Sequence, residues 1–200
     1  ADLRESYRRE REQEKERYHN EIIGYHGSEE GLETLLGYQL FSIGNRADSA
    51  ALVYQVDYVL DGYVKKAGTN FVLSVGRLIG SQPELKGEQR LRKEDIYWEM
   101  PRCYQWDITV NLPEGYRISP EGLERLNVKV ENDCGAFIVQ ATTEDGTLRI
   151  KAEKRINHKT EPVANWEKLL EITDAANSYE ALSIVFQATI NPPTSPTTGY

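Results

Sequence analysis

The stretch Cys103–Ile118, CYQWDITVNLPEGYRI, decides how the rest of the chain is interpreted. Apolar residues fall on every second position of it, with polar residues between them: Tyr104, Trp106, Ile108, Val110 and Leu112. This period of two is typical of a β-strand with one face in a core and the other in water. Pro113 ends the pattern, because proline has no backbone N–H to donate to a sheet. We therefore predict a central core strand that runs into a turn at LPEGY.

The same alternation recurs along the chain and predicts further strands at residues 52–60, 126–130, 137–141, 148–152 and 182–186. Asp145-Gly146 separates two of these runs, and this dipeptide favours the positive φ angles of a type I′ hairpin turn. Residues 126–156 are therefore predicted to form a three-stranded meander. The fold class that follows is mainly β, an antiparallel β-sandwich of about 8–9 strands.

Two segments are predicted to be helical. Residues 1–27 combine mixed charges with a thin apolar stripe, and we expect a charged N-terminal helix there. Residues 160–179 show a helical apolar face after Thr160, which we expect to cap a helix before the last strand. The predicted organisation is a helix at 1–27, a β-sandwich domain at 28–188 and a disordered Pro/Thr-rich tail at 189–200.

Composition excludes several classes of function. The net charge of −8 and the pI near 5.1 argue against nucleic-acid binding, which needs a basic surface. A run of about 18 apolar residues is absent, so we expect no membrane-spanning helix. Residues 1–20 are too highly charged for the apolar part of a signal peptide. If the protein is exported, its signal is expected outside this sequence.

The two cysteines, Cys103 and Cys134, leave two alternatives open, a single disulfide or two free thiols. With three scattered histidines they do not form a compact set of metal ligands, so neither a metal nor a cofactor is expected. A nucleophilic Cys134 would need a base such as His158 and a third orienting group. Four carboxylates that could belong to a glycosidase pair are not singled out by their pattern: Asp95, Asp107, Glu131 and Asp133.

Exposed aromatic side chains are the best candidates for a binding surface in this sequence. Tyr97 and Trp98 are adjacent, so they point to opposite faces of any strand and one of them is expected at a surface or an interface. Tyr116 lies in the LPEGY turn at the end of the stretch Cys103–Ile118. We take Tyr97, Trp98 and Tyr116 as candidate contacts to a glycan or a peptide, since aromatic rings often serve at such surfaces.

Four blocks and the LPEGY turn carry a resemblance to a known family: Val64–Gly68 (VKKAG), Gly76–Gly80 (GRLIG), Val130–Phe137 (VENDCGAF) and Pro162–Ala176 (PVANWEKLLEITDAA). By their order and spacing, residues 20–187 resemble the C-terminal β-rich part of large exported proteins of Gram-negative bacteria that carry a transglutaminase-like core. The resemblance implies a periplasmic or cell-surface location. It also implies upstream domains of the same polypeptide, or an envelope protein, as partners. These motifs are structural and carry no known catalytic role.

Three hypotheses for the function follow. The first is a non-catalytic accessory or interaction domain of such a multidomain protein. The second is a glycan- or peptide-binding module that uses exposed aromatics. The third is an enzyme that depends on Cys134 or on paired carboxylates, which the sequence favours least because it contains no catalytic signature.

Overall fold

The computed structural model describes residues 12–14, 16–17, 20–21, 32–45 and 50–189. These residues belong to two compact units, Ala1–Tyr63 and Val64–Tyr200. Residues 12–14, 16–17 and 20–21 are helical. The rest of the N-terminal helix predicted at residues 1–27, and residues 190–200 of the tail predicted at 189–200, lie outside the described residues. The break after Tyr63 differs from the predicted domain, which ran from residue 28 to 188 without interruption.

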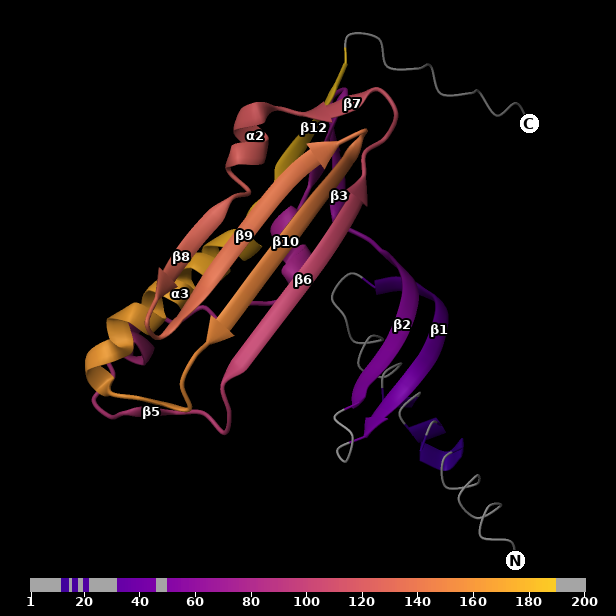
Figure 1. Cartoon of the computed structure of the whole chain (residues 1–200). Helices are drawn as coiled ribbons and strands as arrows, with labels where there is room; N and C mark the ends of the chain where they lie inside the picture. The colour runs from indigo at the N-terminus through magenta and orange to yellow at the C-terminus, as the bar shows by residue number, and fades with distance from the viewer. Residues whose placement is uncertain (1–11, 15, 18–19, 22–31, 46–49, 190–200) are drawn as a thin grey trace, which may run out of the picture. The chain divides into compact units, whose positions relative to one another are not determined.

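The first unit contains a long hairpin of β1 (Leu32–Asn45) and β2 (Ala50–Leu60), which pair in antiparallel fashion (Figure 1). Alternating apolar residues in β2 explain why this segment is extended. The register slips at three places along β1, each of which inserts one residue that has no partner opposite it. The predicted strand at 52–60 is thus confirmed, but it belongs to a two-stranded ribbon.

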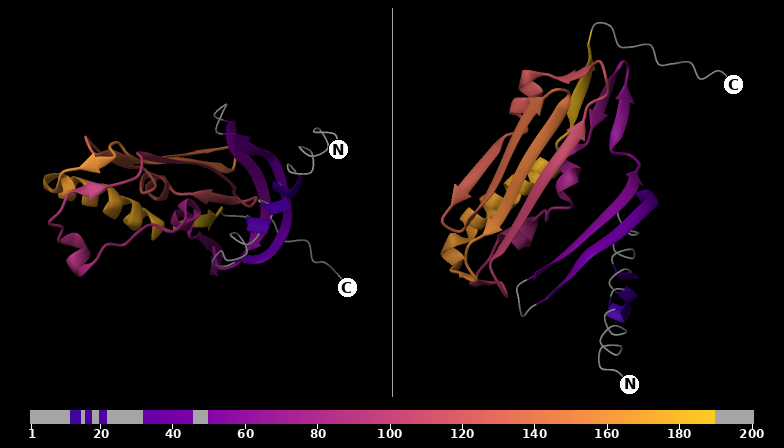
Figure 2. Two further views of the ribbon diagram at one scale, coloured as in Figure 1. Left: turned by 90° about the horizontal axis from the view of Figure 1, so that it is seen from below. Right: turned by 45° about the vertical axis from the view of Figure 1, so that its right-hand side comes forward.

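A four-stranded antiparallel sheet dominates the second unit (Figures 1 and 2). Its order is β6-β10-β9-β8, and the strands span Arg102–Asn111 (β6), Val128–Asn132 (β8), Gly135–Glu144 (β9) and Thr147–Ile156 (β10). The meander predicted at 126–156 is therefore confirmed. The turn between β9 and β10 has φ of 47° at Asp145 and 72° at Gly146, as a type I′ turn requires.

Strand β6, which the sequence analysis predicted to be the central core strand, is not central. β6 pairs only with β10, so it forms an edge of the sheet, and the central strands are β10 and β9. Trp106 is only half-buried, and Tyr104 is 47% exposed. Alternation shows that one face of a strand is buried, but it does not show how many neighbours the strand has. The residues of β9 and β10 on the same face are buried more completely, and Phe137, Leu148 and Ile150 are fully enclosed.

A second four-stranded sheet has the order β3-β4-β12-β7, and its pairs are also antiparallel. Its strands are β3 (Val64–Ala67), β4 (Asn70–Leu73), β7 (Tyr116–Ile118) and β12 (Ile184–Ala188). A short pair of β5 (Ile96–Tyr97) and β11 (Thr160–Glu161) completes the strands. In Figure 1, β12 runs behind β9, so the two larger sheets form the layers of the predicted sandwich.

Helix α3 (Trp166–Glu180) lies behind β8 and β9 and covers the part of the first sheet that the second sheet leaves open (Figures 1 and 2). Its buried residues recur at helical spacing: Leu169, Leu170, Ile172, Ala176 and Tyr179. The Tyr179 ring meets Phe137 of β9 edge to face at 5.8 Å between centroids. A helix before the last strand is therefore confirmed.

The start of that helix was misplaced by the sequence analysis. Thr160 does not cap it but belongs to β11, and the chain passes through the short 3₁₀ turn η3 (Val163–Asn165) before α3 begins. Pro162 explains the delay, because the residue before a proline is pushed out of helical geometry. A five-residue helix that was not predicted, α2 (Pro120–Glu124), follows β7 and is capped by the Ser119 side chain. Two further 3₁₀ turns are η1 (Val75–Ile79) and η2 (Gly87–Arg90). In the described part of the chain, no helix is both long and apolar enough to cross a membrane.

Candidate functional site

The three aromatic residues proposed as a binding surface do not come together. Tyr97 is 63% exposed on β5 and has the Lys159 ammonium 5.2 Å from its ring centre. Trp98 packs against the small cluster of Ile96, Cys134 and Leu169. Tyr116 lies on β7, at the other end of the unit from β5 in Figure 1. Tyr97 is exposed whereas Trp98 and Tyr116 are half-buried, and the three residues do not share one aromatic surface.

Tyr116 has a local structural role. Its hydroxyl donates a hydrogen bond to the backbone oxygen of Thr69 at 3.1 Å, and its ring lies 5.1 Å from that of Phe71. Thr69 comes directly before β4 and Phe71 belongs to β4, so Tyr116 ties β7 to the β3–β4 hairpin. The LPEGY turn therefore connects the two large sheets, which agrees with a structural reading of that motif.

Both cysteines are free in the structure, which decides between the two alternatives left open by the sequence. Cys103 is exposed on β6, directly opposite Arg155 of β10, and Ala136 of β9 lies opposite the same arginine. Because neighbouring strands are about 4.8 Å apart, Cys103 is roughly two strand spacings from this part of β9. Cys134 is fully buried in the turn between β8 and β9, away from this exposed edge of the sheet, so a disulfide does not form.

Cys134 belongs to a polar cluster in which Cys134 and Glu161 are buried and His158 is exposed. Glu161 is only 2% exposed, and its Oε1 lies 2.5 Å from His158 Nδ1. The Asn165 amide donates to Glu161 Oε2 at 2.8 Å. Desolvation opposes ionisation of Glu161, but the hydrogen bonds from Asn165 and His158 outweigh it and lower the pKa of the carboxyl group. The cluster joins β11, the residues after β10 and the start of α3.

The same cluster makes Cys134 a poor nucleophile. Burial, followed by the negative charges of Glu161 and Asp133, raises the pKa of the Cys134 thiol to about 11. A reactive cysteine needs the opposite, a thiolate stabilised by positive charge. Within the described part of the chain, no group of three or more His, Cys, Asp or Glu side chains is arranged to hold a metal ion. The hydrogen bonds of Glu161 with Asn165 and His158 join β11 to the residues after β10 and to the start of α3.

The carboxylates considered for a glycosidase pair are dispersed as well. Glu131 pairs with Arg155, Asp133 pairs with Lys168, and Asp95 accepts a hydrogen bond from the backbone of Val163. Asp107 lies on the outer face of β6, where it lines a shallow hollow with Gln105, Lys151 and Glu153. Glu153 in that hollow is already bonded to Gln105 and Arg155. Asp107 thus shares this hollow with Glu153, and Asp95, Glu131 and Asp133 do not line it.

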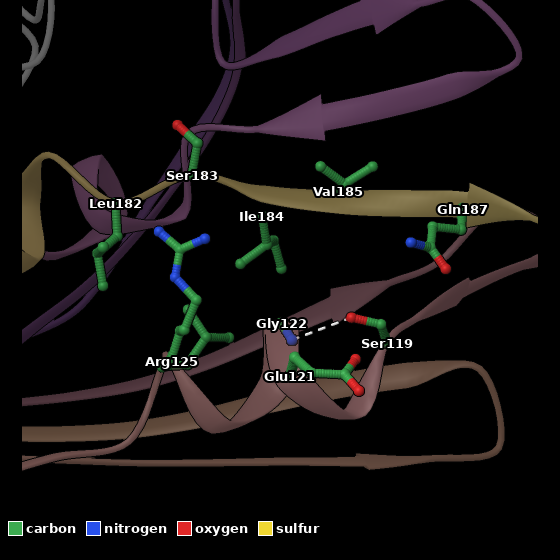
Figure 3. A pocket seen from close by; sticks show the side chains of 10 residues that line it. Ser119, Glu121, Gly122, Arg125, Leu182, Ser183, Ile184, Val185 and Gln187 are labelled. Carbon is green, nitrogen blue, oxygen red and sulfur yellow. Dashed lines mark hydrogen bonds between the residues drawn. The ribbon is translucent and has the colours of Figure 1, made fainter.

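A groove that sequence analysis missed lies between α2 and β12 (Figure 3). It has a volume of about 190 Å³, and β12 and the residues before it form one wall. The other wall comes from the β7–α2 connection and α2, where Ser119 Oγ accepts the Gly122 N–H at 3.0 Å. Arg125 extends from the end of α2 toward Ser183 in Figure 3. The only sequence signal for this groove is that Pro120 ends β7 so early.

Comparison with protein families identifies most of the second unit. DUF3858, a domain of unknown function, matches residues 75–186, which is more than half of the 200 residues. The chain belongs to the DUF3858 family. The match begins at the buried Val75 of η1 and ends at Phe186 of β12, so it contains the Cys134 cluster and every lining residue of the α2–β12 groove except Gln187. The β1–β2 hairpin lies before it. Searches among curated proteins and among solved structures gave no match.

Proposed function

We propose that this DUF3858 domain is a non-catalytic accessory domain of an exported bacterial protein that also carries a transglutaminase-like core. In this proposal the β1–β2 hairpin contacts a neighbouring domain of the same polypeptide. The family resemblance supports the context of the proposal. The exposed apolar residues of the hairpin support its mechanism.

The inserted residues of β1 supply the most exposed of these side chains. Register shifts leave Leu36 and Phe41 without partners on β2, and they are 66% and 58% exposed. Several large apolar residues of β2 are also exposed: Leu52, Val53, Tyr54, Tyr58 and Val59. Successive residues of a strand face opposite sides, so both faces of the ribbon are apolar.

Among the described residues, no third strand pairs with β1 or β2, and the exposed apolar side chains of the hairpin favour a covering partner. An isolated two-stranded hairpin is marginally stable in water, because it lacks a third element on which to bury its side chains. A contiguous exposed apolar patch on a soluble protein marks an interaction site more often than an inert surface. A domain that packs on both faces of β1–β2 would supply this burial, which is why we assign the hairpin to docking.

The test compares this chain alone with the whole natural polypeptide by hydrogen–deuterium exchange. We expect the amides of residues 35–42 and 52–59 to exchange more slowly in the whole polypeptide, while those of β9 and β10 are unchanged. Phe41→Ser should restore fast exchange there, whereas Val64→Ser, which removes an equally exposed residue outside the hairpin, should not. Equal exchange in both proteins would refute the docking role. Peptide or glycan turnover that is lost in Cys134→Ala would refute the non-catalytic role.

A further inference from the structure

Strand β12 is paired along only part of the side that faces β7. On its other side, β4 pairs with Ile184, Val185 and Phe186. The β7 ladder pairs with Phe186, Gln187 and Ala188, and it ends at Ile118. Beyond that residue the chain turns into α2, so β7 does not continue beside residues 182–185. The groove of Figure 3 lies along this length of β12.

The direction of the backbone groups in β12 follows from two hydrogen bonds. The Ala188 N–H donates to Asn70 Oδ1, on the β4 side. The Thr189 N–H donates to the Gly115 oxygen, on the β7 side. In an antiparallel strand these directions alternate, so the backbone groups of Val185 and Ser183 face the β7 side. A strand added in line with β7 would therefore meet Val185 and Ser183 in the correct orientation for pairing.

The groove carries opposite charges near its two ends. Arg125 reaches the end at Ser183, and no carboxylate of the described residues forms an ion pair with its guanidinium. Glu121 lies near the other end, beside Ser119 and Gln187. A strand that runs antiparallel to β12, as β7 does, would begin near Glu121 and end near Arg125. This order suits a segment whose carboxylate lies toward its C-terminal end.

We propose that the groove between α2 and β12 binds an extended peptide segment of a partner protein, as an added antiparallel strand beside Ser183–Val185, with an acidic side chain on Arg125. Main-chain pairing supplies affinity in this mode of recognition, and side-chain contacts supply specificity. Val185, which is 41% exposed, offers an apolar contact to the added strand. Ser183 adds a hydroxyl beside the guanidinium.

A peptide explains the groove better than a small anion does. A free anion would make a single ion pair with the exposed Arg125 guanidinium, and such an exposed ion pair contributes little to affinity in water. A peptide carboxylate meets the same guanidinium after the main chain has been aligned by β12, so the contact needs less ordering. Because the groove is small, we expect dissociation constants of about 0.1 mM.

The proposal is tested by titrating the ¹⁵N-labelled chain with the blocked peptide acetyl-Thr-Val-Thr-Asp-Val-amide. We expect the amide signals of Ser183 and Val185 to shift, and those of the β6–β10–β9–β8 sheet to remain in place. Arg125→Ala should weaken binding about tenfold, which corresponds to the loss of one charge-assisted hydrogen bond. Arg149→Ala is the matched control, because it removes another exposed arginine, on β10, that does not line the groove, and it should leave the affinity unchanged.

Two control peptides, which differ from the first only at the aspartate, test whether binding depends on its charge. Replacing the aspartate by asparagine should weaken binding to the unsubstituted protein as much as Arg125→Ala does. Replacing it by lysine should abolish that binding, but Arg125→Glu should prefer the lysine peptide. The proposal is overturned if the amides of Ser183 and Val185 do not respond at millimolar peptide. Equal binding of all three peptides would also overturn it, as would binding that needs a free C-terminal carboxylate. None of these outcomes bears on hairpin docking, because β1–β2 takes no part in the measurement.

Discussion

A Cβ atom on Gly76 would lie 1.9 Å from the backbone oxygen of Tyr179. Gly76 belongs to η1, Tyr179 lies in the last turn of α3, and the Gly76 N–H donates to the Leu182 oxygen at 3.0 Å. The two segments thus touch backbone to backbone, with no side chain between them. This contact fixes the end of α3 and thereby the start of β12, which forms one wall of the groove.

The first prediction concerns this contact. Gly76→Ala should lower the free energy of unfolding by more than about 3 kcal/mol, because the atoms that its methyl group meets are backbone and cannot rotate away. Urea denaturation followed by tryptophan fluorescence measures the change. Gly146→Ala is the control, since φ at Gly146 is 72° and no atom lies within 4 Å of its Cβ position. It should cost only about 1 kcal/mol, the strain of a positive φ. Equal losses in the two variants would contradict the contact.

The second prediction separates the two thiols. In the native protein at pH 8, a thiol reagent should label Cys103 quickly, because it is exposed, and leave Cys134 intact. With a pKa of about 11, only about one Cys134 in a thousand would be a thiolate at that pH, even before its burial is considered. One thiol should therefore titrate in native buffer and two in urea. In the Cys103→Ser variant, no thiol should titrate in native buffer and one should titrate in urea. Rapid native labelling of that variant would show that Cys134 is accessible.

The third prediction is a pH dependence that arises from Glu161. Its hydrogen bonds with Asn165 and His158 lower the folded-state pKa below the ordinary value of 4.5, despite the opposing effect of burial. The stability from this carboxylate is thus fully present above pH 4.5 and is lost as the pH falls through the folded-state pKa. Glu161→Gln should cost about 1–3 kcal/mol at pH 7, and this difference should shrink toward pH 3.

Urea midpoints between pH 7 and pH 3 measure this difference. Both proteins will lose stability in acid, because other carboxyl groups also have lowered pKa values in the folded state: Glu131, Asp133, Glu153 and Asp174. The signal is therefore the gap between the two curves. If the gap were constant across this range, Glu161 would not be the titrating group.

Local patterns in the sequence were sufficient for the strands that alternate strongly. The Asp145-Gly146 turn and the β8–β9–β10 meander depend on contacts between residues close in the chain, and these were predicted correctly. β6 was given a central place because its alternation is the clearest, yet its position at the edge depends on which strands pair across long separations. The α2–β12 groove was missed for the same reason, since Arg125 and Ser183 are brought together only by tertiary folding.

The Cys134 cluster shows how far the sequence alone could identify the residues that lie together at a site. The sequence analysis considered Cys134 with His158 and stated that the pair would need a third orienting group, which it did not name. In the structure the residue next to both is Glu161, which in the sequence resembles an ordinary surface glutamate beside Pro162. Its burial follows from the β5–β11 pairing, a contact between residues more than 60 positions apart. Only that pairing reveals that the cluster holds a carboxylate and raises the pKa of the thiol.

The last prediction compares two tryptophans that pack against the same small core of Ile96, Cys134 and Leu169. The indole N–H of Trp166 donates to the Arg90 backbone oxygen at 2.8 Å, and the Arg92 guanidinium lies 5.4 Å from the ring centre. Both Trp166 and Trp98 are half-buried, so replacing either by phenylalanine removes similar apolar contacts. Trp166→Phe should therefore cost about 1 kcal/mol more than Trp98→Phe, because it also leaves the Arg90 carbonyl without its donor. Urea denaturation of the two variants gives the difference. A loss in Trp98→Phe as large as that in Trp166→Phe, or larger, would contradict the stabilising role of the hydrogen bond to Arg90.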